Sequence, residues 1–280
     1  MSETAELAAL LAELGVRRGG TLLVHASLGG SGWRDTEVRD ALLAALGPEG
    51  TLVVPAFTPE NSDTSSAHRR LTAGMTERQK AAFRAAMPPF VPRTSGCPSM
   101  GRLAECVRTT PGAVRSTHPQ TSFAALGPRA AALLDRHHPH CHLGELSPLA
   151  RLYEADAHVL LLRVGFTVCS AFHLAEYRMV PPPALRTYRC VVRSTGNWIA
   201  YRDVVLDDSD FGAIGAALPR GLLAEGEVAG KPVALCRIRE LVDHGADIMS
   251  GFRRGMTGNG QLGDGEVGHI VHPGRGNAPR

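Results

Sequence analysis

Short apolar runs alternate with helix-like patterns at the start of the chain. Thr21–His25 and Thr51–Pro55 have the length and composition of buried strands. Between them, apolar residues repeat at helical spacing from a cap at Thr36 to Leu46, and Glu6–Leu14 shows the same repeat. A strand–helix–strand order of this kind predicts a βαβ unit with parallel strands.

The remaining apolar segments continue this pattern of strands and helices. Two of the predicted strands flank a short turn, Ser194–Asn197, so we expect them to form an antiparallel hairpin. The fold class predicted is therefore α/β: a single mixed-sheet domain flanked by helices, with a βαβ start and antiparallel strands in the C-terminal part. The predicted strands are Thr121–Leu126, His158–Val164, Tyr188–Arg193 and Trp198–Val205, and the predicted helices are Thr76–Met87, Met100–Thr109, Arg129–Arg136, Ser147–Glu154, Ser170–Tyr177, Asp208–Leu218 and Ala234–Met249.

Two segments interrupt the regular pattern. Residues 56–99 are polar and rich in proline, as is typical of an insertion that forms a lid or a binding loop. Residues 253–280 are rich in glycine and polar residues, so the pattern predicts a disordered tail after a domain of residues 1–252.

Composition narrows the class of protein. The chain has 280 residues, of which 44% are hydrophobic and 20% charged, and its net charge of +3 is not concentrated in any segment. A binding surface for nucleic acid is therefore not indicated. Six scattered cysteines, an acidic N-terminus and the lack of an apolar run of about 20 residues predict a cytoplasmic protein with reduced thiols that does not enter a membrane.

The stretch Ser170–Tyr177 carries the most specific candidate chemistry. It follows a predicted buried strand, and its His173 and Glu176 are three residues apart, so on a helix they share one face. A histidine beside a carboxylate at the carboxyl end of a strand suits a general base with its orienting partner. The alternative is a histidine satisfied within the structure and a solvated helix glutamate.

Two loops of small residues also lie at the ends of predicted strands. His25–Gly29 resembles a nucleophile elbow without its first glycine, which would make Ser27 the nucleophile of a serine hydrolase with His173 as base. The same loop could instead present backbone N–H groups to a pyrophosphate or a pantetheine chain, or be a plain connection. The Arg115–Ser122 loop is either a further binding segment or an ordinary turn.

Two other motifs lack the context that their chemistry requires. His137–His142 contains four imidazoles and Cys141, but neighbours in one short loop cannot all reach one ion, so we expect an exposed loop and no metal. Gly258–Gly263 matches G-x-G-x-x-G, yet it neither follows a predicted strand nor begins a predicted helix.

Several segments, taken together and in order from about Leu7 to Phe252, resemble the aminoglycoside 3-N-acetyltransferase family, the antibiotic acetyltransferases outside the GNAT fold. Their shared order is far more specific than any single motif. The segments are Leu23–Leu28, Gly47–Pro55, Met100–Glu105, Arg115–Gly127, Leu143–Tyr153 and His173–Arg178, with weaker matches at Asp210–Gly215 and Arg239–Asp243.

The resemblance implies direct transfer of an acetyl group from acetyl-CoA to an amine of an aminoglycoside within a ternary complex, and hence antibiotic resistance. It places the active-site histidine and glutamate at His173 and Glu176. A hydroxyl or backbone N–H near Ser27 or Ser122 would stabilise the developing oxyanion. The segments that would bind acetyl-CoA contain His25, Ser27, Leu28, His118, Thr121, Ser122 and Phe123.

The sequence departs from the family at two places that bear on the acceptor. Phe166–Ser170 has no carboxylate, although many relatives carry one there, and Asn61–Thr76 lacks the tryptophan-containing segment of several resistance enzymes. The carboxylates that bind the acceptor are therefore expected elsewhere, at Asp63, Glu145 or Asp208.

Several alternatives follow from these departures. The acceptor could have fewer amines or be acetylated at a position other than N3. The chain could also be a serine or thioester hydrolase, or bind acyl-CoA or an antibiotic without catalysis. The oligomer expected is a monomer or a homodimer.

Overall fold

The computed structural model describes residues 3–191 and 194–257. Its main sheet has seven strands in the order β3-β4-β2-β1-β5-β9-β8. The three central strands are parallel, and the outer strands are antiparallel to their neighbours. The strands are β1 (Thr21–Ala26), β2 (Thr51–Pro55), β3 (Val114–Arg115), β4 (Phe123–Leu126), β5 (His158–Leu162), β8 (Ala224–Val228) and β9 (Lys231–Arg237).

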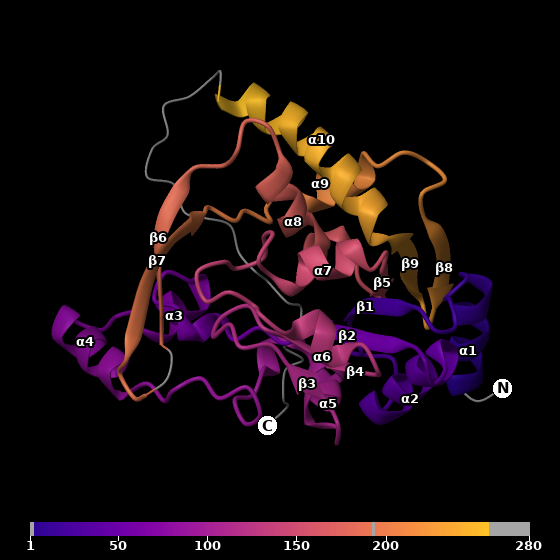
Figure 1. Cartoon of the computed structure of the whole chain (residues 1–280), viewed down its shortest axis with the longest axis horizontal. Helices are drawn as coiled ribbons and strands as arrows, with labels where there is room; N and C mark the ends of the chain where they lie inside the picture. The colour runs from indigo at the N-terminus through magenta and orange to yellow at the C-terminus, as the bar shows by residue number, and fades with distance from the viewer. Residues whose placement is uncertain (1–2, 192–193, 258–280) are drawn as a thin grey trace.

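Helices cover both faces of this sheet (Figure 1). The strands alternate in the way that a two-sided sheet requires: in β1, Leu23 faces one apolar cluster, whereas Leu22 and Val24 face the other. The helices are α1 (Glu3–Glu13), α2 (Asp35–Leu46), α3 (Ser66–Leu71), α4 (Glu77–Ala86), α5 (Arg102–Thr109), α6 (Ala130–Leu134), α7 (Pro148–Glu154), α8 (Ala171–Arg178), α9 (Phe211–Ala216) and α10 (Ile238–Thr257), with 3-10 turns η1 (Pro59–Asn61), η2 (Pro98–Met100) and η3 (Phe166–Val168).

This architecture confirms the predicted α/β fold with its βαβ start and its late antiparallel strands. Helix α2 connects the parallel strands β1 and β2, as the apolar pattern predicts. The cap of α2 differs from the prediction, because Arg34 and not Thr36 is the capping residue, paired with Glu37. None of the helices in the described ranges is long and apolar enough to cross a membrane.

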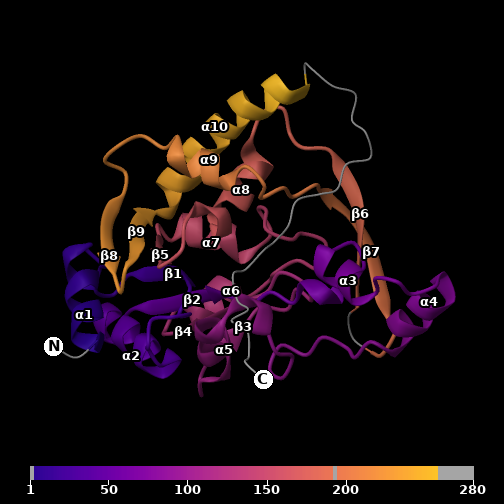
Figure 2. The same cartoon turned by 180° about the vertical axis from the view of Figure 1, so that it is seen from behind.

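The predicted hairpin is present as a separate two-stranded sheet of β6 (Leu185–Val191) and β7 (Trp198–Val204). It extends from the body of the protein as an arm that reaches α4 (Figures 1 and 2). The indole N–H of Trp198 donates to the carbonyl of Arg84 on α4, 3.1 Å away. The insertion around residues 56–99 thus packs against the arm.

Within the insertion, the Thr76-capped helix is confirmed as α4. The Thr76 hydroxyl accepts from the Gln79 N–H, and the Thr76 N–H donates to Oε1 of the Gln79 side chain. Helix α3 was missed because its polar sequence reads as a loop, although Ser65 caps it.

The predicted helix over Ala234–Met249 is wrong at its start. Ala234 to Arg237 belong to β9, which pairs with β5, and α10 begins only at Ile238. The apolar residues of this segment fit the spacing of a strand as well as that of a helix. Hydrogen-bond pairing with the edge of the buried β5 makes the segment a strand. Helix α10 also continues to Thr257, past the boundary at residue 252 where the predicted tail begins. Residues 258–280, including the G-x-G-x-x-G match, lie outside the described residues.

Gly127, directly after β4, provides a test of the packing between β4 and β2. Its φ is +128°, and a Cβ atom there would lie 2.3 Å from the Gly50 carbonyl oxygen. Gly221 has a similar positive φ of +92° but no heavy atom within 4 Å of the same position. We expect Gly127→Ala to lower the free energy of unfolding by about 1–3 kcal/mol more than Gly221→Ala, measured by urea denaturation. Equal losses in the two variants would show that the close approach does not matter.

Candidate active site

His173 and Glu176 form a buried pair on α8, directly after β5 and η3. The His173 Nδ1 atom lies 2.6 Å from Glu176 Oε2, and the two residues are 8% and 0% exposed. Because a carboxylate only accepts hydrogen bonds, Nδ1 carries a proton, and in the neutral imidazole Nε2 is then the acceptor nitrogen. The alternative of a solvated helix glutamate is therefore wrong, and His173 has the tautomer of a general base.

The second oxygen of Glu176 is held from outside α8. Oε1 accepts from the backbone N–H of Asp207 and from Nη1 of Arg253, each at 2.8 Å. Arg253 was missed because it fell in the predicted tail. It continues the inward face of α10 through Val242, Ala246 and Met249, and this spacing is the signal that could have found it.

The end of β1 lies next to the start of α8. The Ser170 N–H donates to Nε2 of the buried His25 at 3.4 Å. Leu28 is buried in the core, and Ser27 is half-buried with its N–H bonded to the Leu162 carbonyl. No hydrogen bond joins Ser27 to His173 among the described residues, so the central contact of a serine hydrolase is not formed there.

The loop from His118 to Phe123 is rigid and buried. His118 Nδ1 accepts from the N–H groups of Gln120 and Thr121, and the Ser122 hydroxyl donates to the Ala56 carbonyl at 2.9 Å. The Phe123 ring is fully buried and packs edge-on against Phe57. The backbone of the loop is also bonded within the protein, since the carbonyls of Gln120 and Ser122 accept from the N–H groups of Thr58 and Ala56.

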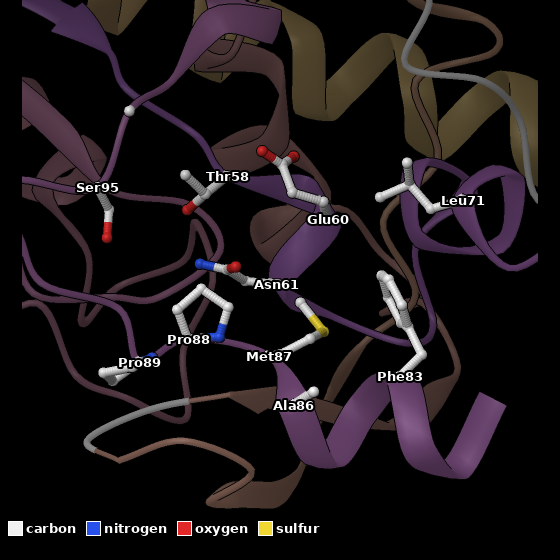
Figure 3. A pocket seen from close by; sticks show the side chains of 11 residues that line it. Thr58, Glu60, Asn61, Leu71, Phe83, Ala86, Met87, Pro88, Pro89 and Ser95 are labelled. Carbon is white, nitrogen blue, oxygen red and sulfur yellow. The ribbon is translucent and has the colours of Figure 1, made fainter. Parts of the chain in front are cut away.

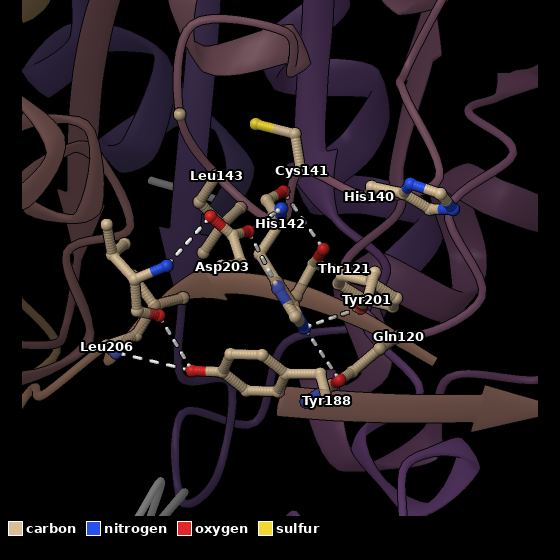
Figure 4. A network of polar contacts seen from close by, with 12 residues as sticks. Gln120, Thr121, His140, Cys141, His142, Leu143, Tyr188, Tyr201, Asp203 and Leu206 are labelled. Atoms are coloured by element: carbon tan, nitrogen blue, oxygen red, sulfur yellow. Dashed lines mark hydrogen bonds and ion pairs between the residues drawn. The ribbon is translucent and has the colours of Figure 1, made fainter. Parts of the chain in front are cut away.

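The histidine loop is only partly exposed, contrary to the prediction. His137 and His142 are buried, whereas His138 and His140 are exposed. His142 donates through Nδ1 to Asp203 and contacts the Tyr201 hydroxyl through Nε2 at 3.0 Å (Figure 4). In the part of the chain that the structure describes, no group of three or more potential ligands is placed to hold a metal ion.

This histidine network connects the arm to the predicted site. Asp203, on β7, also accepts from the Tyr177 hydroxyl of α8 at 2.7 Å. The Tyr201 hydroxyl lies 3.3 Å from His118 Nε2 in the neighbouring loop. The arm, the His118–Phe123 loop and α8 are thus fixed relative to one another by buried polar contacts.

The three predicted acceptor carboxylates have different surroundings. Asp63 is paired with Arg189, and Glu145 with Arg178. Asp208 is half-buried and close enough to His173 to interact with its charge. Burial raises the pKa of Asp208 to about 6, with smaller contributions from neighbouring acids.

A cavity of about 370 Å³ lies within the insertion, lined by η1, α3, α4 and the loop after α4 (Figure 3). Its wall contains Glu60, whose pKa is raised by burial, and Asn61, whose amide donates to the Pro119 carbonyl at 2.9 Å. His173 is not part of its lining. The cavity was missed because this segment reads as a polar loop. The lining residues are Thr58, Glu60, Asn61, Leu71, Phe83, Ala86, Met87, Pro88, Pro89, Ser95 and Gly96.

His173 lies near the start of α8 with a buried carboxylate partner, in a mixed α/β protein, and a histidine in this arrangement can accept a proton from a bound molecule. Residues 23–250 match the family described as aminoglycoside 3-N-acetyltransferase. The chain belongs to this family, which confirms the resemblance given by its motifs.

Its relatives match over most of their length. The aminoglycoside N(3')-acetyltransferase-like protein YokD of Bacillus subtilis is 32% identical over 242 residues, which cover 83% of this chain and 87% of YokD. Aminoglycoside N(3)-acetyltransferase VIII of Streptomyces fradiae is 33% identical over 273 residues, covering 89% and 92% of the two chains. The crystal structure of YokD superimposes with a TM-score of 0.82 at 29% identity, over 90% of this chain and 94% of YokD.

Two similar structures contain ligands. AAC-IIIb, solved as a binary complex with CoASH, has a TM-score of 0.76 at 27% identity and covers 89% of this chain and 96% of its own. A variant of AAC(3)-IVa in complex with a gentamicin has a TM-score of 0.70 at 29% identity, covering 89% and 88%.

The buried histidines predict a pH-dependent stability. Burial lowers the pKa of His137 to about 4, and burial together with the neighbouring imidazoles lowers the pKa of His118. Between about pH 4 and 6.5 the unfolded chain therefore binds more protons than the folded protein, so stability falls as the pH falls through this window. Each such histidine contributes up to about 1.4 kcal/mol per pH unit.

Urea unfolding at pH 7.5, 6.5, 5.5 and 4.5 measures this loss. His137→Gln should make the dependence shallower, whereas the matched change at the exposed His138 should leave it unaltered. A stability that is constant from pH 6.5 to 4.5 would contradict the interpretation of a neutral buried cluster.

Proposed function

We propose that the protein transfers the acetyl group of acetyl-CoA to an amine of an aminoglycoside-like acceptor by direct attack in a ternary complex. The observation that carries the proposal is the buried His173–Glu176 pair, which leaves Nε2 of His173 as the acceptor nitrogen. Membership of the aminoglycoside 3-N-acetyltransferase family supplies the reaction class.

The proposed reaction uses His173 as the base. Nε2 takes a proton from the amine as the amine nitrogen attacks the thioester carbonyl carbon. The tetrahedral intermediate then loses the thiolate of CoA, which takes up the proton that the imidazolium returns. Glu176 keeps Nδ1 protonated and stabilises the imidazolium between these steps.

We propose that acetyl-CoA lies along the two loops that the sequence motifs indicated, those of His25 to Leu28 and of His118 to Phe123. The Ser27 N–H and the Ser122 hydroxyl are already bonded within the protein. The Ser27 hydroxyl is therefore the better donor for the thioester oxygen, where negative charge develops.

Asp208 is the best candidate to bind the amine. It is close to His173, whereas Asp63 and Glu145 are each neutralised by an arginine. A site with few unpaired carboxylates suits an acceptor with fewer amines than the common antibiotics. Acetylation at a position other than N3 fits the same acceptor site.

Acetyl-CoA consumption with a panel of aminoglycosides tests the reaction. We expect products heavier by one acetyl group and a turnover that falls about 10²–10⁴-fold in His173→Ala, because the general base is lost. His140→Ala, a change at an exposed histidine, is the matched control. Full activity in His173→Ala would reject the mechanism, and labelling of Ser27 by a fluorophosphonate would favour the hydrolase.

Asp208→Asn tests the acceptor site. We expect KM for the amine to rise about 10-fold with little change in KM for acetyl-CoA, because one ion pair to the amine is lost. In the wild-type enzyme, KM for the amine should rise below about pH 6, where Asp208 takes up a proton. The exposed Asp135→Asn should have neither effect. An unchanged KM in Asp208→Asn would place the amine elsewhere.

A further inference from the structure

We propose that Arg253 of α10 is a positioning residue that holds both the carboxylate partner of the base and the loop that carries the acceptor-binding Asp208. The inference rests on the proposed acetyl transfer for its kinetic consequences. The geometry that supports it is independent of the reaction.

One edge of the guanidinium holds Glu176. Its Nη1 donates to Glu176 Oε1 at 2.8 Å, while Oε2 accepts from His173 Nδ1. Glu176 is fully buried, so a carboxylate without this cation would be a buried charge with no opposite charge beside it. Arg253 thus supplies the opposite charge beside Glu176 and holds its carboxylate so that one oxygen is left for His173.

The other edge holds the loop before α9. Nε and Nη2 donate to the two carboxylate oxygens of Asp210, at 2.8 and 2.7 Å, and Nη2 also donates to the Asp207 carbonyl at 2.8 Å. The Asp207 N–H in turn donates to Glu176. Asp208 lies between these two anchored residues, so its position follows from theirs.

This set of contacts requires arginine. The planar guanidinium donates through two nitrogens to the Asp210 carboxylate and through the third nitrogen to Glu176. The compact ammonium of a lysine could not reach both carboxylates with this geometry. The side chain of Arg253 is only 16% exposed, so it acts through its protein partners. Helix α10 also lies close to α8, since a Cβ at Gly245 would be 3.0 Å from the Phe172 ring.

The charges around His173 and Glu176 show what the loss of Arg253 would change. Without the guanidinium, an excess of negative charge would surround the buried pair. The groups that face His173 or its partner are Glu176 on α8, Asp207, Asp208 and Asp210 in the loop before α9, His142 in the histidine loop and Arg253 on α10.

Three substitutions separate the two tasks of Arg253. In Arg253→Gln we expect kcat to fall about 10–100-fold and KM for the amine to rise. Arg253→Lys keeps the charge but loses the fork, so KM should rise while kcat falls less than in Arg253→Gln. Asp210→Asn should raise KM and leave kcat nearly unchanged.

Hydrogen exchange of residues 207–211 gives a second measurement that does not depend on activity. Exchange should become faster in Arg253→Lys, because the fork that anchors the loop is lost. Arg254→Gln, at the neighbouring exposed arginine, is the matched control and should match the wild type in every measurement.

The outcomes are distinct. A wild-type protein that acetylates no amine rejects the proposed function, while the exchange measurement still tests Arg253. A folded Arg253→Gln protein with wild-type kinetics overturns the inference. If that variant does not fold, Arg253→Lys decides: unchanged KM and unchanged exchange overturn it, and faster exchange supports it.

Discussion

The site depends on one fully buried carboxylate, that of Glu176. A buried charge is tolerated only when it is neutralised and its oxygens are hydrogen-bonded. Glu176 meets both conditions with three donors, of which one lies on its own helix, one on the loop before α9 and one on α10. The need to satisfy this group therefore fixes the relative positions of three segments and the tautomer of His173.

A second buried polar network, at the base of the arm, also holds separate segments together through hydrogen bonds. His142 and Asp203 join the loop that follows α6 to β7, and Tyr177 brings α8 into the same set of contacts. Because Tyr177 directly follows Glu176, the two networks meet on one helix. A movement of the arm would therefore displace α8, the helix that carries His173 and Glu176.

Local periodicity was sufficient for the central elements. The apolar runs that form β1, β2 and β5 predict strands that are buried on both faces of the sheet. The helical spacing of apolar residues predicts α2, and a capping threonine predicts α4. The same periodicity failed at β9, where the pattern suits both a strand and a helix and the pairing with β5 decides. Long-range pairing of this kind is not encoded in any single window of sequence.

The contacts of the candidate site could be predicted only in part. The pairing of His173 with Glu176 could be predicted because the two residues are close in sequence on one helix. Arg253 could not be found in that way, since it lies 77 residues from its partner. The burial of His137 and His142 was also unexpected, because it depends on Asp203 and Tyr201 from the arm.

The position of Arg253 has a consequence for the order in which the protein is made. The residues of β1, the His118 loop and α8 leave the ribosome long before the final turns of α10. The His173–Glu176 pair therefore stays without this cation until Arg253 has been added to the chain. A product truncated at residue 252 would keep every strand of the sheet yet lack the positive charge beside Glu176.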